Sequence, residues 1–286
     1  MRNLASPRVI KEILSEYEFR FSKSLGQNFL IDEGALSQIV AGADIKDTDC
    51  VLEIGPGFGT LTQRLAAAAK KVVCVEIDKT VIPILSENLK DFDNFEIVNS
   101  DIMKIDIKSL IAEKFGSEKV KVAANLPYYI TTPIIMSLLE SRANFESITV
   151  MVQKEVAKRL CAECGTKDFG AISLAVQYFC NAEYLFEVPP SSFMPPPKVT
   201  SAVVRLDLLE KKRVCVKSEE MFFKTVKAAF AQRRKTLLNA LSNAGCFGKS
   251  KDEISKILTD VGIDAKRRGE TLSIFEFAAL SDMLGK

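Results

Sequence analysis

The chain of 286 residues contains no histidine. This absence excludes a Ser-His-Asp or Cys-His catalytic group, the HExxH zinc site and any imidazole general base. The chain also lacks an apolar stretch long enough to span a bilayer, and its first residues carry charges throughout, unlike a signal peptide. We therefore expect a cytoplasmic protein with no membrane partner, whose chemistry depends on a cofactor and on positioning.

Cysteine occurs in an odd number, seven. This count does not fit the even framework of a small secreted disulfide scaffold and favours a reducing compartment. Cys161 and Cys164 form the only CxxC pair, and zinc would need two further ligands that neither histidine nor a second pair supplies. We expect these two residues to be plain thiols near a helix end, and we expect no metal.

Positive charge is concentrated late in the chain. Residues 205–286 contain 17 Lys and Arg against 11 Asp and Glu, although the formal net charge of the whole chain is only +2. Within this part, Arg233, Arg234 and Lys235 follow the amphipathic stretch FFKTVKAAF, which predicts a helix end or a tight bend there. These cations could complement the helix dipole or bind the phosphates of a nucleic acid, and a solvated surface is the alternative.

The order of apolar runs predicts the fold. Five short runs alternate with helical patterns, which indicates a parallel sheet covered by helices. The runs lie at 51–54, 72–77, 95–98, 120–124 and 147–152, with helical patterns at 61–69 and 80–89. A further strand is expected at 201–208, after a stiff extended loop at 189–197 that holds half of the ten prolines.

Beyond residue 210 the pattern is wholly helical. Two capping boxes, Ser250-x-x-Glu253 and Ser273-x-x-Glu276, each precede an apolar run and mark helix starts. We expect an α/β domain over residues 1–210, with a helical N-terminal extension, and a small all-helical domain over residues 211–286. Composition points weakly to a monomer.

A glycine-rich turn follows the first strand of the predicted sheet. Residues 51–59 read VLEIGPGFG, with Gly55 and Gly57 where backbone could approach a ligand closely. The nicotinamide fingerprint GxGxxG would need glycine at position 60, which is Thr60. The turn by itself is weak evidence, because a strand-to-helix turn often carries glycine for steric reasons.

Two carboxylates end the next two strands. Glu76 lies 21 residues after Gly55, where a carboxylate can accept hydrogen bonds from both ribose hydroxyls. This role indicates a nucleoside without saying which one. Asp101 follows the third strand, where its carboxylate could accept a hydrogen bond from an adenine amino group or could instead cap a helix.

The tetrapeptide Asn125-Leu126-Pro127-Tyr128 ends the fourth strand. The lone pair of an adenine amine is delocalised into the ring, so the amine is a poor nucleophile. If the Asn125 oxygen and a backbone carbonyl accept its two hydrogens, the lone pair is directed at an electrophilic methyl group. Tyr128 would stack on the base, a contact worth roughly 1–3 kcal/mol. A proline turn with a core tyrosine is the alternative, but the position at the carboxyl edge of the sheet favours a binding site.

These motifs and several others place the chain in a known family by resemblance. It resembles the bacterial small-subunit ribosomal RNA adenine dimethyltransferases, relatives of the macrolide-resistance rRNA methylases. The matching segments are SLGQNFLID at 24–32, EIGPGFGTLT at 53–62, VEID at 75–78, SDIMKID at 100–106, NLPYYITTPI at 125–134, MVQKEVAKRL at 151–160, FMPPPKVTSAVVRL at 193–206 and FAQRRKTLLNAL at 230–241. Tyr129 departs from the usual pattern, because some members carry asparagine at this position.

The resemblance implies a Rossmann-like methyltransferase sheet that binds S-adenosylmethionine, and it implies a role for each matching residue. Asn28 and Leu30 would contact the methionine part of the cofactor or close over it, beside Gly55 and Gly57. Glu76 would hold the ribose and Asp101 the adenine. Asn125 would face both the methyl donor and the target amine, with the flipped base between Tyr128 and Phe193.

The activity that the resemblance implies is dimethylation of N6 in two adjacent adenosines of the 3′-terminal hairpin loop of small-subunit (16S) rRNA. The partner would be this rRNA in a 30S precursor particle, bound in part by the basic helical domain, and the role would be in small-subunit biogenesis. Two alternatives stay open on the sequence. One is a large-subunit rRNA adenine methylase of the macrolide-resistance type, and the other is a non-catalytic assembly or RNA-binding factor on the same fold.

Overall fold

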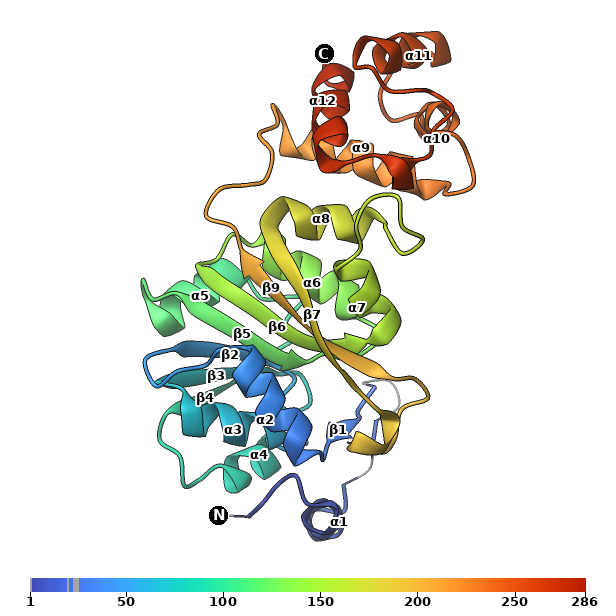
Figure 1. Cartoon of the computed structure of the whole chain (residues 1–286). Coiled ribbons are helices and arrows are strands. Elements are labelled where there is room, and N and C mark those ends of the chain that lie inside the picture. The colour runs from blue at the N-terminus through green and yellow to red at the C-terminus, as the bar shows by residue number, and fades with distance from the viewer. Residues whose placement is uncertain (1, 20, 23–25) are drawn as a thin grey trace. The chain divides into compact units, whose positions relative to one another are not determined.

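The computed structural model describes residues 2–19, 21–22 and 26–286, which form two units (Figure 1). The first unit extends to Ala157 and resumes over Glu183–Leu208, whereas the second comprises Lys158–Ala182 and Leu209–Lys286. The last boundary between the units, at Leu209, lies close to the boundary expected at residue 210. The second unit also contains the earlier segment Lys158–Ala182, which the sequence placed in the α/β domain. The cause is packing, since Phe169 and Tyr178 belong to the hydrophobic cluster of the C-terminal helices.

A seven-stranded sheet forms the centre of the first unit, in the order β4-β3-β2-β5-β6-β9-β7. Its strands are β2 (Cys50–Ile54), β3 (Lys71–Glu76), β4 (Phe95–Asn99), β5 (Val120–Asn125), β6 (Phe145–Gln153), β7 (Cys180–Val188) and β9 (Ser201–Leu208). Strands β2 to β6 pair in parallel and β9 pairs antiparallel with β6. All six expected strands are present. Strand β7 was not predicted, because its sequence CNAEYLFEV mixes polar and apolar residues without a clear alternation.

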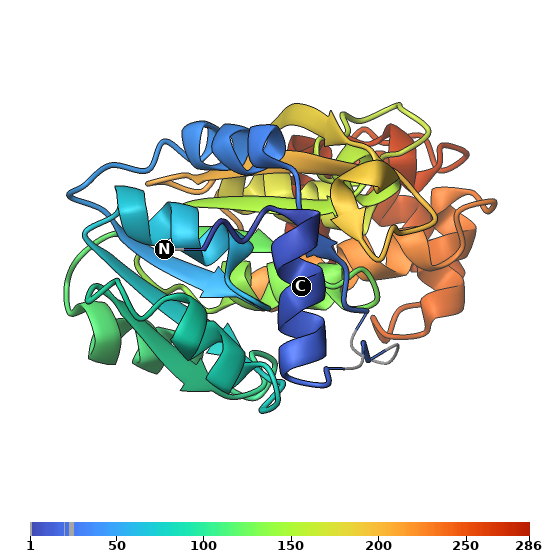
Figure 2. The same cartoon turned by 90° about the horizontal axis from the view of Figure 1, so that it is seen from below.

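Helices join the strands and cover both faces of the sheet (Figures 1 and 2). They are α2 (Glu33–Gly42), α3 (Thr60–Ala68), α4 (Ile82–Asn88), α5 (Ile107–Phe115), α6 (Thr131–Glu140) and α7 (Lys154–Leu160), and α1 (Pro7–Glu16) precedes the first strand. Asp32 and Asp106 cap α2 and α5 by accepting hydrogen bonds from Ala35 N and Ser109 N. Local sequence therefore sets where these two helices begin.

Burial of apolar residues orients the covering helices. Leu36 of α2 and Leu65 of α3 share one hydrophobic cluster with Val51, Val72 and Val203 of the sheet. Helix α1 packs instead on the glycine turn and α4, in a cluster that includes Ile10, Ile13, Phe58 and Leu85. Figure 2, seen from below, shows α1 in front of this end of the sheet. The N-terminal extension is thus part of the first unit and reaches the glycine turn.

A two-stranded ribbon lies beside the main sheet. Strand β1 (Phe29–Leu30) pairs antiparallel with β8 (Phe193–Met194), and Leu30 lies opposite Phe193. The short helix η2 (Pro190–Ser192) precedes β8, so the proline-rich loop is partly ordered as a 3₁₀ turn and a strand rather than a plain extended segment. The ribbon joins the GQNFL segment to the PPPK loop, two segments far apart in the sequence.

The second unit is helical in its C-terminal part, as expected. Its elements are α8 (Ala171–Phe179), α9 (Glu219–Ala231), α10 (Leu237–Ala244), α11 (Lys251–Asp260), η3 (Gly269–Thr271) and α12 (Ile274–Leu284). Both predicted capping boxes are confirmed, at Ser250 with Glu253 and at Ser273 with Glu276. In the described part of the chain, no helix is long and apolar enough to cross a membrane.

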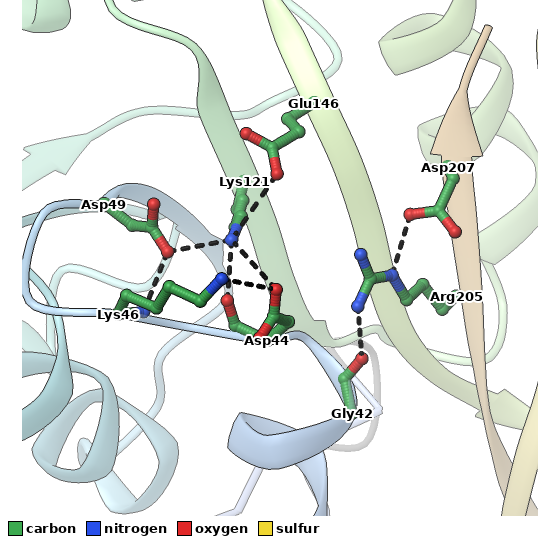
Figure 3. A network of polar contacts seen from close by, with 8 residues as sticks. All are labelled: Gly42, Asp44, Lys46, Asp49, Lys121, Glu146, Arg205 and Asp207. Atoms are coloured by element: carbon green, nitrogen blue, oxygen red, sulfur yellow. Dashed lines mark hydrogen bonds and ion pairs between the residues drawn. The ribbon is translucent and has the colours of Figure 1, made fainter.

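A buried lysine lies at the centre of a network of polar contacts (Figure 3). The network lies at the amino ends of the parallel strands, whereas the glycine turn lies at their carboxyl ends. The side chain of Lys121, 4% exposed at the start of β5, lies 2.8 Å from the carboxylate of Asp49 and 3.5 Å from that of Glu146, and donates to the backbone carbonyl of Asp44 at 2.6 Å. Arg205 of β9 donates to the carbonyl of Gly42 at 3.1 Å. Lys121 therefore holds the connection between α2 and β2 to β5, and Arg205 holds the end of α2 to β9.

Candidate active site

A pocket that opens to solvent lies at the carboxyl ends of β2, β3, β4 and β5. Parallel strands end at the same edge of a sheet, so residues distant in the sequence meet there. Ten of the eleven residues that we assigned to cofactor and target lie on its wall: Asn28, Leu30, Gly55, Gly57, Glu76, Asp101, Asn125, Leu126, Pro127 and Tyr128. Phe193 is the exception.

Gly55 and Gly57 of the turn are each required to be glycine for a different physical reason. Gly55 has φ +67°, and a Cβ added to it would meet nothing within 4 Å, so its backbone is open to the cavity. Gly57 has φ +56°, and a Cβ there would lie 2.6 Å from a ring carbon of Phe29. The ring of Phe29 in turn stacks on Phe58 with 4.1 Å between centroids. Gly57 therefore makes room for protein, whereas Gly55 leaves room for a ligand.

Glu76 is buried at the end of β3, and burial raises the pKa of its carboxyl. One carboxylate oxygen accepts from the backbone N–H of Asp78 at 2.8 Å and the other from that of Gly57 at 3.2 Å. Each oxygen has a second lone pair, so both can still accept a ribose hydroxyl. The two backbone bonds fix the carboxylate in the geometry that a nucleoside needs.

Asp101 lies beyond the end of β4 and accepts a hydrogen bond from the N–H of Met103 at 3.0 Å, within a turn. The alternative role as a helix N-cap is wrong, because the next helix, α5, is capped by Asp106. The second oxygen of Asp101 is 3.9 Å from Lys104 Nζ. The carboxylate remains available on the cavity wall.

Asn125 occupies the last position of β5, and its side-chain nitrogen donates to the backbone carbonyl of Asn28 at 3.1 Å. A carbonyl can only accept, so this bond turns the Asn125 nitrogen toward the GQNFL segment, and no donor among the described residues bonds to its oxygen. In the same turn, the Pro127 carbonyl accepts from Ile130 N and from Thr131 Oγ1. Among the described residues, the Leu126 carbonyl accepts no such bond, so it is an available backbone acceptor.

The two aromatic residues expected around a flipped base differ in environment. Tyr128 lines the cavity, and its hydroxyl forms a hydrogen bond with Ser201 Oγ at 2.5 Å. Burial raises the pKa of this phenol. Phe193, only 3% exposed, packs in a hydrophobic cluster with Leu30 and does not line the cavity. Phe193 is here a core aromatic residue.

Glu53 is a wall residue to which the sequence analysis gave no role. It lies one residue before the end of β2, is 2% exposed, and burial raises the pKa of its carboxyl to about 8. The Cys74 thiol donates to this carboxyl at 3.6 Å. The motif VLEIG contains the residue, but only the structure shows the burial that raises the pKa of its carboxyl.

The sequence pattern of the family described as "Ribosomal RNA adenine dimethylase" matches residues 18–280. The chain belongs to this family. The resemblance inferred from the motifs is confirmed, and the chain is an S-adenosylmethionine-dependent rRNA methyltransferase.

Curated relatives of this dimethylase cover its whole length. It is 53% identical over 286 residues to "Ribosomal RNA small subunit methyltransferase A" of Alkaliphilus oremlandii, covering 100% of this chain and 99% of the relative. It is 52% identical to the protein of the same name from Clostridioides difficile, covering 99% and 98%. The match over both units shows that the helical unit belongs to the family pattern as well.

Solved structures show the same fold for this dimethylase. A dimethyladenosine transferase from Plasmodium falciparum is similar with a TM-score of 0.74 and 29% identity, covering 88% of this chain and 95% of that one. The 23S rRNA methyltransferase ErmE is similar with a TM-score of 0.67 and 25% identity, covering 91% and 100%. The predicted Rossmann-like sheet with a helical C-terminal domain is therefore confirmed.

The basic cluster of the dimethylase lies in the turn between α9 and α10, at the helix end that the sequence predicted. Arg233 donates to the carbonyls of Lys167 and Phe169, at 2.7 and 3.1 Å, and so holds a loop of its own unit. Arg234 and Lys235 are exposed, and their side chains make no ion pair with any residue that the structure describes. Arg233 is therefore held by hydrogen bonds within its own unit, whereas Arg234 and Lys235 are exposed to solvent.

Two further wall residues, Gln27 and Tyr129, received no role in the site from the sequence. Gln27 accepts from the N–H of Ser22 at 2.8 Å and donates to the carboxylate of Asp78 at 2.7 Å, which joins the GQNFL segment to the loop after β3. Tyr129 lines the cavity beside Tyr128. The motifs GQNFL and NLPYY contain both residues, but a motif does not show which side chains face the cavity.

Proposed function

We propose that this dimethylase transfers two methyl groups to N6 of each of two adjacent adenosines in the 3′-terminal hairpin loop of small-subunit rRNA. The geometry of Asn125 is the observation that carries the proposal, because its side chain presents a fixed acceptor at the cavity beside an aromatic face. Its relatives are named small-subunit methyltransferases over their full lengths, which favours this substrate over large-subunit rRNA.

The cofactor site is formed by residues that fit a nucleoside with an amino-acid tail. Gly55 offers open backbone, Glu76 offers two free lone pairs for the ribose, and Asp101 offers an acceptor for an adenine amine. Asn28 and Leu30 lie on the wall where the tail would be. S-adenosylmethionine supplies an electrophilic methyl group on a sulfonium, and loss of a neutral thioether requires no metal.

The chain itself activates the target by orientation. We infer that Asn125 Oδ1 and the Leu126 carbonyl accept the two hydrogens of the adenine N6, which directs its lone pair at the methyl group. Bound S-adenosylmethionine would supply the methyl group as its carbon–sulfur bond breaks, and the proton of the product amine would leave to solvent. Tyr128 supplies a face on which the flipped base stacks, and its bond to Ser201 fixes the ring. Repetition with the monomethylated amine gives the dimethyl product.

RNA affinity comes in part from the helical unit. We infer that Arg234 and Lys235 contact phosphate and that Arg233 holds their turn while contributing positive charge. The substrate particle is a precursor of the small ribosomal subunit, and the enzyme acts on it as a cytoplasmic monomer. A hairpin loop already exposes unpaired bases, which lowers the cost of extruding each adenosine.

The test is tritium transfer from labelled S-adenosylmethionine to small subunits that lack the modification, followed by nucleoside analysis of the digested RNA. The expected product is N6,N6-dimethyladenosine in the 3′-terminal hairpin. Label in large-subunit rRNA would establish the macrolide-resistance type of methylase instead. Binding of RNA without any consumption of the cofactor would establish a non-catalytic factor.

A further inference from the structure

Tyr129 stands out among the residues of the cavity wall because it is a large aromatic side chain that is 59% exposed. It directly follows Tyr128, whose hydroxyl is tied to Ser201. Among the described residues, the hydroxyl of Tyr129 makes no hydrogen bond. The two adjacent tyrosines are therefore different, one fixed within the wall and one presented at the mouth.

The ring of Tyr129 is nevertheless held in place. A Cβ added to Gly26 would lie 3.4 and 3.6 Å from Cδ1 and Cε1 of this ring, so one edge of the ring rests on the backbone of Gly26. Gly26 itself has φ +60°, a conformation that side-chain-bearing residues rarely adopt. The ring is thus supported from behind by the GQNFL segment while most of its surface faces solvent.

A flipped adenosine leaves its neighbour without a stacking partner. The proposed substrate contains two adjacent adenosines, so one base enters the cavity while the next remains at the mouth with one face uncovered. An aromatic side chain at the mouth can cover that face, and stacking of this kind tolerates any base. Phe193 cannot supply the surface in this structure, because it is buried away from the cavity.

We propose that Tyr129 is the stacking platform for the nucleobase adjacent to the target adenosine. This inference rests on the proposed function and adds a second base-binding position to the site. Tyr128 receives the base that reacts and Tyr129 receives the base that does not. Because the contact is the same before and during methyl transfer, it contributes to RNA affinity and not to the chemical step.

The experiment compares the wild type with Tyr129→Leu, Tyr129→Phe and, as a matched control, Tyr184→Leu. Tyr184 is a partly exposed tyrosine of the same unit that lies outside the cavity wall. The affinity for unmethylated small subunits is measured by filter binding in the presence of S-adenosylhomocysteine, which makes the result independent of turnover. The affinity for S-adenosylhomocysteine alone and kcat at saturating subunits are measured in parallel.

We expect Tyr129→Leu to weaken subunit binding by roughly tenfold, with kcat and cofactor affinity within about twofold of the wild type. Tyr129→Phe and Tyr184→Leu should bind subunits as the wild type does. Equal subunit affinity in Tyr129→Leu and wild type would overturn the inference, as would an equal loss in Tyr129→Phe, which would assign the effect to the hydroxyl. A wild type that binds subunits without methylating them would contradict the proposed function and leave this comparison intact.

Discussion

The side-chain nitrogen of Asn125 donates to the backbone carbonyl of Asn28, 97 positions earlier in the chain, at 3.1 Å. This bond determines which end of the amide faces the cavity, since a carbonyl oxygen accepts and cannot donate. The same segment is tied to Asp78 through Gln27 and to Phe193 through Leu30. The acceptor that we propose for the target amine is therefore oriented by the N-terminal segment, which also lines the same cavity.

The first prediction concerns the amide itself. Asn125→Ala should lower kcat by at least about 100-fold, because one prearranged partner of the reacting amine is removed. The affinity for S-adenosylmethionine should stay within a few-fold of the wild type, since the amide acts mainly on the target. Single-turnover methylation and calorimetric titration of the cofactor measure the two quantities. An Asn125→Ala enzyme with normal kcat would contradict the mechanism.

The second prediction concerns the two glycines of the turn. Gly55→Ala adds a methyl group in open space, so it should weaken cofactor binding while costing only about 1 kcal/mol of stability through backbone strain. Gly57→Ala places its methyl group against the ring of Phe29 and should lower stability more. Urea unfolding and cofactor titration of both variants separate the effects. If Gly55→Ala and Gly57→Ala lower the stability equally, the ring of Phe29 moves aside at little cost in free energy.

The third prediction concerns the pH dependence of stability. Glu53 has a pKa of about 8 in the folded chain because it is buried, against 4.5 for the ordinary carboxyl. The folded state thus keeps a proton that the unfolded state loses, so this group lowers stability as pH rises between about 4.5 and 8, by up to ~1.4 kcal/mol per unit. Glu53→Gln, which resembles the neutral acid in shape, should flatten this decline. Urea unfolding of the wild type and of Glu53→Gln at pH 6 and pH 8 measures this difference. The same fall in unfolding free energy in both proteins would count against a raised pKa of Glu53.

The fourth prediction concerns the network at the opposite edge of the sheet. Lys121→Met should destabilise the chain by about 3 kcal/mol, because it leaves Asp49 without its buried partner. Lys46→Met is the control, since Lys46 is 62% exposed where it pairs with Asp44, and its loss should destabilise the chain much less. Chemical denaturation gives both values. Cofactor affinity should not change in either variant. Similar stability losses in Lys121→Met and Lys46→Met would show that burial of Lys121 contributes little to the stability of its ion pairs.

The fifth prediction concerns the basic turn. Replacing Arg234 and Lys235 by Gln should weaken RNA binding and reduce the slope of log affinity against log salt by nearly one unit for each phosphate that the protein no longer neutralises. Arg233→Gln should in addition lower the thermal stability, because the hydrogen bonds to Lys167 and Phe169 cannot form. Salt titrations of binding and thermal unfolding distinguish these roles. An unchanged slope in the double variant would show that Arg234 and Lys235 contact no phosphate and form only a solvated surface.

Local sequence determined much of this protein. The spacing of apolar residues marked six strands, Ser250 and Ser273 marked two helix starts, and the motifs around Gly55, Glu76 and Asn125 indicated the cofactor and target classes. Each of these signals acts over a few residues, through hydrogen bonds to nearby backbone or through the alternation of side chains across a strand. Such information is present in the chain before it folds.

Only the tertiary structure decided how distant segments meet. It placed Phe193 opposite Leu30 in a buried ribbon rather than at the cavity, turned the Asn125 nitrogen to Asn28, and left Tyr129 exposed on Gly26. It also raised the pKa of Glu53 by burying it, and it placed Lys158–Ala182 in the helical unit. These outcomes depend on packing and on the exclusion of water between segments far apart in the chain, and no local pattern of residues encodes them.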